Sequence, residues 1–161
     1  MTGLRLVIAA LVLSTACRQG ESAPGVDGSG LLVLERTEPS SEQLLRVPAV
    51  ARYCERDSVL SIVGMSSTWS AALALRTGWA PDTGRDFTVG PALDSVGTAA
   101  AAARALNVDS QQSIQSRSGT LSISSVDPLA GSFTLEAGQD STTTRLTGRF
   151  ERLSLTRACA S

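Results

Sequence analysis

The residues of this chain that could do chemistry are few, and histidine is not among them. Its absence excludes Ser-His-Asp and Cys-His catalysis, histidine-ligated metals and the usual proton shuttle near neutral pH. Three cysteines, some closely spaced carboxylates and a few aromatic side chains remain. No Gly-x-Ser-x-Gly or Ser-x-x-Lys motif accompanies them, and no glycine loop connects a strand to a helix. We therefore expect no catalytic residue, no cofactor and no metal ion.

The strongest candidate for ligand binding is the loop at 78–85. Its tryptophan, Trp79, could stack against a sugar ring while Asp82, Arg85 and Asp86 bind hydroxyl groups. The alternative is structural, with Trp79 folded back to cap the open end of the fold. Asp82 and Asp86 could act as a glycosidase pair if they lay roughly 5–10 Å apart. Their spacing equally suits a solvated turn.

The first cysteine, Cys17, closes a segment typical of an export signal. A single Arg5 precedes an apolar run over 6–13, and three small residues follow. The run is too short for a membrane-spanning helix, which needs about 20 apolar residues. Residues 1–16 therefore predict a signal peptide. The residues before Cys17 resemble the lipobox of bacterial lipoproteins, although Ser14 stands where that pattern usually has leucine.

The lipobox resemblance implies that Cys17 is acylated, palmitate included, and becomes the first residue of the mature protein. The next residue is Arg18, whereas lipoproteins kept at the inner membrane often have aspartate there. We therefore expect a lipid-anchored protein of the bacterial cell envelope, at the outer membrane rather than the inner one. The alternative is an ordinary secretory signal that leaves Cys17 as a free thiol.

The other two cysteines, Cys54 and Cys159, form an even pair in an oxidising compartment. A disulfide between them would close a loop of roughly 100 residues, which the chain-entropy model values at about 4.7 kcal/mol. It would hold the C-terminal strand against an early strand. The alternative is two unpaired thiols.

The remaining chain divides into a tether and one domain. Residues 17–30 are rich in glycine, serine and other small residues and predict a flexible linker, which would hold the domain on the order of 20 Å from the bilayer. Residues 31–161 suffice for a single core. The net charge of −1 provides no basic excess to attract nucleic acid or an anionic membrane surface.

Apolar and polar residues alternate through most of this domain, as in half-buried antiparallel strands. The alternation is cleanest over 119–124, 129–136 and 145–151, with a phase change that predicts a bulge near Glu151 and Arg152. Less polar strands are expected at 47–54, 59–65 and 69–76. We therefore predict an all-β fold, an antiparallel sandwich or partly closed barrel of about eight strands.

Residues 98–106 conflict with this pattern because they contain five consecutive alanines. Helix propensity favours a short helix there, with Ser95 as N-cap and Asn107 as the C-terminal stop. Alanine also suits a tightly packed strand. Both interpretations remain open from the residues alone.

Four short motifs resemble a group of small bacterial lipoproteins of unknown function. They are Phe-x-Val-Gly at 87–90, Ser-Gly-Thr-Leu-x-Ile at 118–123, and Gly-x-Phe at 131–133 and 148–150. The resemblance covers roughly Val47 to Leu155. It implies an antiparallel β domain on a lipid anchor and an extended segment at 98–106. It implies no activity and no catalytic residue.

The sequence thus predicts a lipid-anchored, non-catalytic binding module for a glycan or an envelope protein. A structural or assembly role without a small ligand is the alternative, and a carboxylate-dependent glycan hydrolase is a third. Apart from the membrane that holds the lipid, no partner is specified by the sequence.

Overall fold

The computed structural model describes residues 30–37, 42–78, 81–93, 100–138 and 143–159, and in these ranges the chain is all β. This confirms the predicted fold class. Ten strands form one continuous sheet in this part of the chain. They are β1 (Leu31–Arg36), β2 (Glu42–Cys54), β3 (Val59–Met65), β4 (Trp69–Arg76), β5 (Asp86–Gly90), β6 (Ala101–Asn107), β7 (Ser113–Val126), β8 (Leu129–Gly138), β9 (Thr144–Leu153) and β10 (Leu155–Arg157).

The sheet closes on itself as a nine-stranded mixed barrel. Its order is β1-β9-β8-β7-β5-β6-β4-β3-β2, and β1 completes the ring by pairing with β2. Strand β5 pairs with β7 antiparallel and with the start of β6 parallel, whereas β6 and β7 also pair directly further along. The ring is complete within residues 31–153, so its closure does not depend on the segment before the domain.

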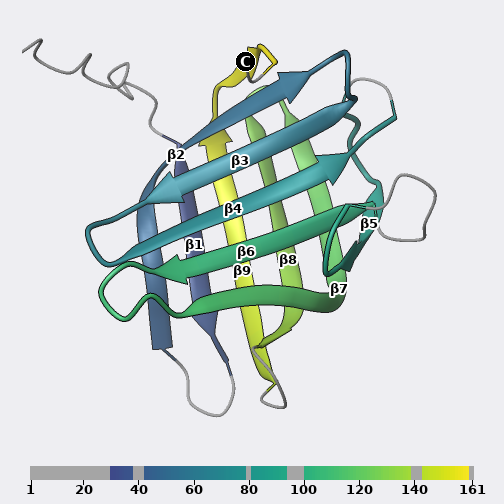
Figure 1. Ribbon diagram of the computed structural model, residues 1–161. Helices are drawn as coiled ribbons and strands as arrows, with labels where there is room; N and C mark the ends of the chain where they lie inside the picture. Colours follow the sequence, from purple (N-terminus) through teal and green to yellow (C-terminus); the bar gives the residue numbers. More distant parts are fainter. Residues whose placement is uncertain (1–29, 38–41, 79–80, 94–99, 139–142, 160–161) are drawn as a thin grey trace, which may run out of the picture.

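The two halves of the barrel cross each other (Figure 1). Strands β2, β3, β4 and β6 run across the front of the view, and β1, β9 and β8 rise more steeply behind them. The viewer therefore sees the outer surface of the β2-β3-β4-β6 half. Strand β10 lies outside the ring, parallel to the end of β2.

One core fills the space between the halves. Inward side chains alternate with outward ones along each strand, and the largest fully buried ones include Phe87, Phe150, Leu60 and Ile62. Trp69 packs against this core.

The two Gly-x-Phe motifs interlock inside the barrel. Gly131 is paired with Phe150, and Phe133 is paired with Gly148, across β8 and β9. Each phenyl ring lies over the glycine of the other strand, because a Cβ at Gly131 would overlap the Phe150 ring and one at Gly148 would overlap the Phe133 ring. The repeated motif is therefore one packing unit shared by two strands.

The alanine run forms a strand, β6, over its described part, and residues 98 and 99 lie outside the described ranges. Ala101, Ala103 and Ala105 face Leu75, Leu73 and Ala71 of β4 in register. Small side chains at these inward positions leave room for the leucines, so packing within the barrel overrides helix propensity.

The expected bulge in β9 is also present. Leu129 pairs with Leu153 and Gly131 with Phe150, so one intervening residue on β8 faces two on β9. Arg152 within this bulge has a positive φ of 53°. The extra residue brings Leu153 back into the core, where it is buried.

Candidate functional site

The Cys54–Cys159 disulfide is formed, across a sequence separation of 105 residues. Cys54 is the last residue of β2, and Cys159 follows β10. Besides the disulfide, β10 is held by its parallel register with β2 and by a hydrogen bond from the Ala158 amide to the Tyr53 carbonyl. The bond therefore fixes the C-terminal segment to an early strand, as predicted.

The predicted loop site is described only in part, because Trp79 lies outside the described residues. Asp82 accepts a hydrogen bond from the Thr83 amide at 2.8 Å, which is a local turn contact. Arg85 extends towards the Thr77 carbonyl, 3.4 Å away, and its Cζ lies 5.4 Å from the centre of the Phe87 ring.

Asp86, in β5, accepts a hydrogen bond from the hydroxyl of Ser122 in β7. This contact joins the two paired strands at their surface. Asp82, Arg85 and Asp86 thus each have a partner within the fold.

Two other carboxylates lie in the turn after β2, and both are ion-paired. Glu55 accepts from Arg157 at 3.1 Å, and Asp57 accepts from Arg56 at 3.2 Å. Nowhere in the described ranges do three or more acidic or cysteine side chains gather closely enough to hold a metal ion.

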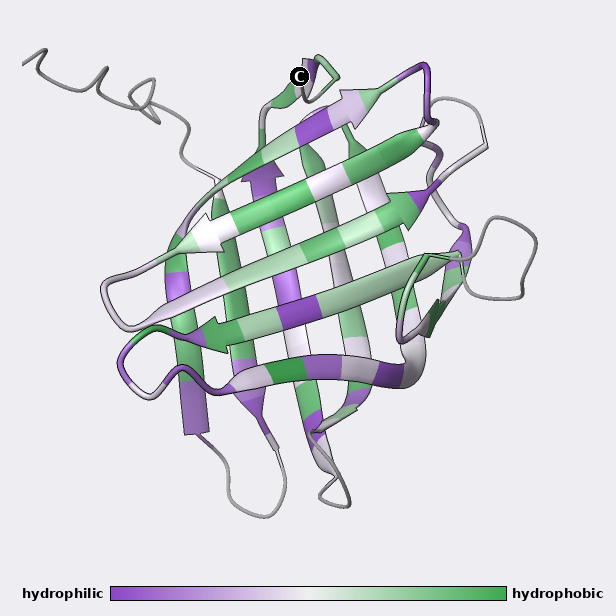
Figure 2. Ribbon diagram, in the orientation of Figure 1, coloured by the Kyte–Doolittle hydropathy of each residue, from purple (hydrophilic) through white to green (hydrophobic). Residues whose placement is uncertain are grey.

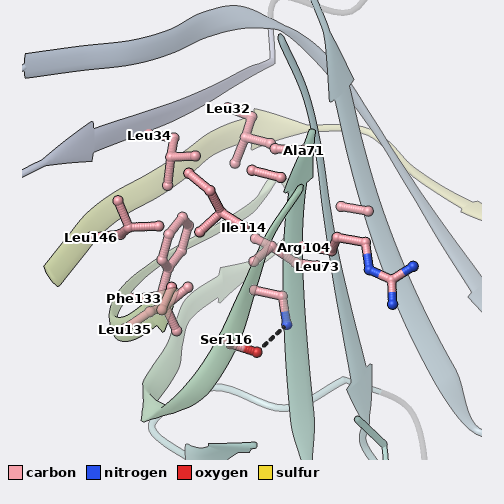
Figure 3. A pocket seen from close by; sticks show the side chains of 14 residues that line it. Leu32, Leu34, Ala71, Leu73, Arg104, Ile114, Ser116, Phe133, Leu135 and Leu146 are labelled. Atoms are coloured by element: carbon pink, nitrogen blue, oxygen red, sulfur yellow. Dashed lines mark hydrogen bonds between the residues drawn. The ribbon is translucent and has the colours of Figure 1, made fainter. Parts of the chain in front are cut away.

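The barrel interior is filled by side chains (Figure 3). Leu34, Phe133, Leu135 and Leu146 point towards one another, whereas the guanidinium of Arg104 points away. The cavity left between them measures about 20 Å³. A single water needs about 10–15 Å³ and small-molecule pockets hold about 300–1,000 Å³, so this interior is a core and not a ligand chamber.

Ser116 is the polar group at the edge of that cavity, and its hydroxyl is fully engaged. It donates to the Gly90 carbonyl at 2.6 Å and accepts from the Ala103 amide at 2.9 Å. This side chain of β7 therefore connects β5 and β6 at Gly90, the last residue of β5.

A larger hollow lies on the outside of β2 and β3, with a volume of about 460 Å³. Its floor is built from outward-facing pairs of the two strands, Val50 with Val63 and Arg52 with Ser61. Val59 extends the floor, and the segment at Ala158 and the disulfide end of β2 close one side. The hollow has the size of a small-molecule site and a mostly apolar lining.

Arg52 is the cation of this hollow. In the described part of the chain, its guanidinium makes no hydrogen bond or ion pair. Asp57 also lines the hollow, but Arg56 neutralises it. The site therefore offers an apolar floor and one unpaired positive charge, which suits an amphipathic ligand with an anionic group.

Val50, Arg52, Val59 and Val63 are not among the site residues predicted from the sequence. A signal for Val59 and Val63 exists in β3, which has apolar side chains at both inward and outward positions, although a barrel strand buries only one face. Apolar residues on both faces predict that something covers the outer one.

Comparison of the chain with protein-family models, curated proteins and solved structures finds no match. The likeness of its motifs to small lipoproteins therefore remains an expectation from the sequence. Within the described ranges, no helix is long and apolar enough to span a bilayer.

Proposed function

We propose that this protein is a lipid-anchored component of the bacterial cell envelope and that its barrel is a non-catalytic binding module. Cys17 would carry the lipid, and the linker up to residue 30 would connect it to the barrel. The observation that carries the binding role is the outer hollow on β2 and β3, where Arg52 is unpaired above an apolar floor.

The filled interior directs binding to the outer surface of the barrel. An amphipathic anion could place its apolar part on Val50 and Val63 and its charged group on Arg52. A glycan or envelope protein held by the Trp79 loop remains part of the proposal, and the two sites make different predictions.

A structural or assembly role is the second candidate. It is favoured by the local contacts of Asp82, Arg85 and Asp86, which serve the fold itself. A protein with this role would bind none of the small ligands. Replacing Arg52 or Trp79 would then leave the binding signal unchanged.

The anchor is tested by the mass of the N-terminal peptide of the protein purified from bacterial membranes. We expect a peptide that begins at an acylated Cys17, and we expect Cys17→Ala to release the protein from the membrane fraction. An unmodified Cys17 at the mature N-terminus would refute the anchor.

The binding role is tested by thermal unfolding of the chain without residues 1–16 and with Cys17→Ser, under non-reducing conditions. The panel contains alkyl phosphates, peptidoglycan fragments and oligosaccharides. A ligand at about 100 times its dissociation constant should raise Tm on the order of 5–10 °C. Loss of the shift in Arg52→Gln, with Arg149→Gln as the charge-matched control, assigns it to the hollow; loss in Trp79→Ala assigns it to the loop. No shift with any compound favours the structural role.

A further inference from the structure

The hollow belongs to a wider surface, which we call the apolar face: the outward side chains of β2 from Val50 onwards and of β3, β4 and β6. Successive rows across it are aligned by the strand register. One row is Met65, Ser70 and Leu106, and the next is Val50, Val63, Ala72 and Arg104.

All large hydrophobic side chains exposed in the described part of the chain lie on this face or in the turn beside it. They are Val50, Val63, Met65, Leu106 and Val108. Met65 is the most exposed, at 65%. The turns at the ends of β3 and β6 are adjacent, because the Val108 amide donates to the Thr68 carbonyl at 2.7 Å. Met65, Leu106 and Val108 therefore gather at one edge. Figure 2 shows how little strongly hydrophilic colour β3 and β4 carry compared with β9.

Three arginines share this face, namely Arg52, Arg76 and Arg104. None of their guanidinium groups is hydrogen-bonded or ion-paired within the described residues. Strands β3, β4 and β6 contain no carboxylate, and β2 has only Glu42 at its first residue, which is ion-paired with Arg36. The carboxylates that border the face lie in turns, at Glu55, Asp57 and Asp109.

On the opposite side of the barrel, the arginines are ion-paired with carboxylates. On β1 and β9, Arg149 contacts Glu35 at 3.9 Å and Glu151 at 2.5 Å. Arg145 lies 4.0 Å from Glu136 of β8. Charges there are balanced and paired, whereas the arginines of the apolar face have no charged partner among the residues that the structure describes. Its complement must therefore be both apolar and anionic.

The chain enters the barrel at the boundary between β2 and β9, where the apolar face ends, and a Cβ at Gly30 would meet Leu153 of β9. Gly30, the first described residue, accepts a hydrogen bond through its carbonyl from the Ala49 amide at 3.2 Å, one residue before Val50. If Cys17 is lipidated, the linker attaches the bilayer to the β2 border of the apolar face, on the order of 20 Å away. A tether of this length keeps the apolar face within reach of the membrane.

We infer that the apolar face docks on the anionic lipid surface of the membrane that holds the anchor. Met65, Leu106 and Val108 enter the boundary between headgroups and acyl chains, and the three arginines contact lipid phosphates. A second copy fits less well, since two such faces would oppose unpaired arginines on two convex surfaces. This inference rests on the proposed anchor for its geometry, but the face can be tested without it.

The first experiment uses vesicles and the chain without residues 1–16, with Cys17→Ser, since the ring is complete within residues 31–153. We expect binding to vesicles of phosphatidylcholine with phosphatidylglycerol and little binding to phosphatidylcholine alone. Arg52→Gln and Arg104→Gln should each lower the partition coefficient about fivefold. Arg145→Gln and Arg149→Gln change the net charge equally and should have little effect. Equal losses in both pairs, or equal binding to both vesicles, would overturn the inference.

The second experiment uses Met65 in the protein purified with its lipid, where it is the one methionine after removal of residues 1–16. Hydrogen peroxide should oxidise Met65 several-fold more slowly in anionic vesicles than in zwitterionic ones. Equal rates would contradict the inference. Protection in native membranes but not in anionic vesicles would show that a protein covers the face, which also excludes the lipid surface. Failure of lipidation would appear separately, in the N-terminal peptide mass.

Discussion

At the scale of single residues, the packing of β8 on β9 depends on Gly131 and Gly148, which leave room for the two phenyl rings. Gly148 lies under the Phe133 ring, and a methyl group there would also meet the Val33 carbonyl. We expect Gly148→Ala to reduce the free energy of unfolding by about 1–3 kcal/mol, the usual cost of overpacking. Urea unfolding measures the loss, and Ser132→Ala, at an exposed position of β8, should stay within about 0.5 kcal/mol of the parent protein.

A double-mutant cycle separates this clash from an unrelated backbone effect. Phe133→Leu removes part of the ring that the new methyl group would strike. The double variant should therefore lose less stability than the two single variants combined. Strict additivity would show that the ring and the glycine do not interact as the register indicates.

Ser116 is the other residue on which several strands depend. Ser116→Ala leaves the Gly90 carbonyl and the Ala103 amide without their partner in a buried site, at a cost of about 1–3 kcal/mol. Chemical unfolding of the variant tests this, with the exposed Ser118→Ala as control. Equal stabilities of the two variants would mean that water replaces the Ser116 hydroxyl.

Among the elements, β10 depends most on the disulfide. It pairs with β2 over only three residues and lies outside the ring. We expect Cys54→Ser with Cys159→Ser to lower stability by up to about 4.7 kcal/mol in the chain-entropy model. Hydrogen exchange should show lost protection in β10 while β3 and β8 stay protected at low denaturant. Loss of protection throughout would show that the barrel itself needs the bond.

The elements also show which parts of the fold were accessible from sequence. Strands β8 and β9 alternate cleanly because their outer face is polar, so the sequence revealed both their faces and the bulge. In β3, and in β6 apart from Arg104, both faces carry apolar or small side chains, so periodicity could not indicate which face is buried. The short strands at β5 and β10 were also expected, but their pairing partners lie far away in the sequence and no local pattern encodes them.

The contacts of the predicted loop residues were likewise only partly predictable. The spacing of Asp82, Arg85 and Asp86 placed them near one another in sequence, but their partners Thr83, Thr77 and Ser122 depend on the folded backbone. The Cys54–Cys159 pair was predictable because assigning Cys17 to the expected anchor leaves two cysteines, an even number. The position of Arg52 was not predictable, because whether an arginine has a carboxylate partner depends on which residues the fold places around it.

At the scale of the whole molecule, the two sides of the barrel differ in their charges, and the net charge does not show this difference. The total of −1 suggested no attraction to an anionic surface. Over the described ranges, the fold places paired charges on β1, β8 and β9 and arginines without an ion pair on the apolar face. At 0.1 M salt, interactions between charges are screened beyond about 10 Å. A ligand at the surface therefore interacts with the charges of the nearest side of the barrel and not with the net charge of the whole molecule.

Closure of the ring makes a final prediction about the whole molecule. Every strand of the ring has two neighbours, so loss of β1 removes pairings from β2 in one half and β9 in the other. Unfolding should therefore be a single cooperative transition. Leu32, fully buried in β1, tests this, since Leu32→Ala should cost about 2–5 kcal/mol.

Two spectroscopic signals, both measured in a Trp79→Phe background, show whether the two halves of the barrel unfold together. Far-ultraviolet circular dichroism follows all strands, and fluorescence then follows Trp69, which packs against the core from β4. Leu32→Ala should shift the urea midpoints of both signals equally, although β1 and β4 are not paired. If the fluorescence midpoint stayed in place while the dichroism moved, the two halves would unfold independently, and ring closure would not couple the apolar face to the rest of the barrel.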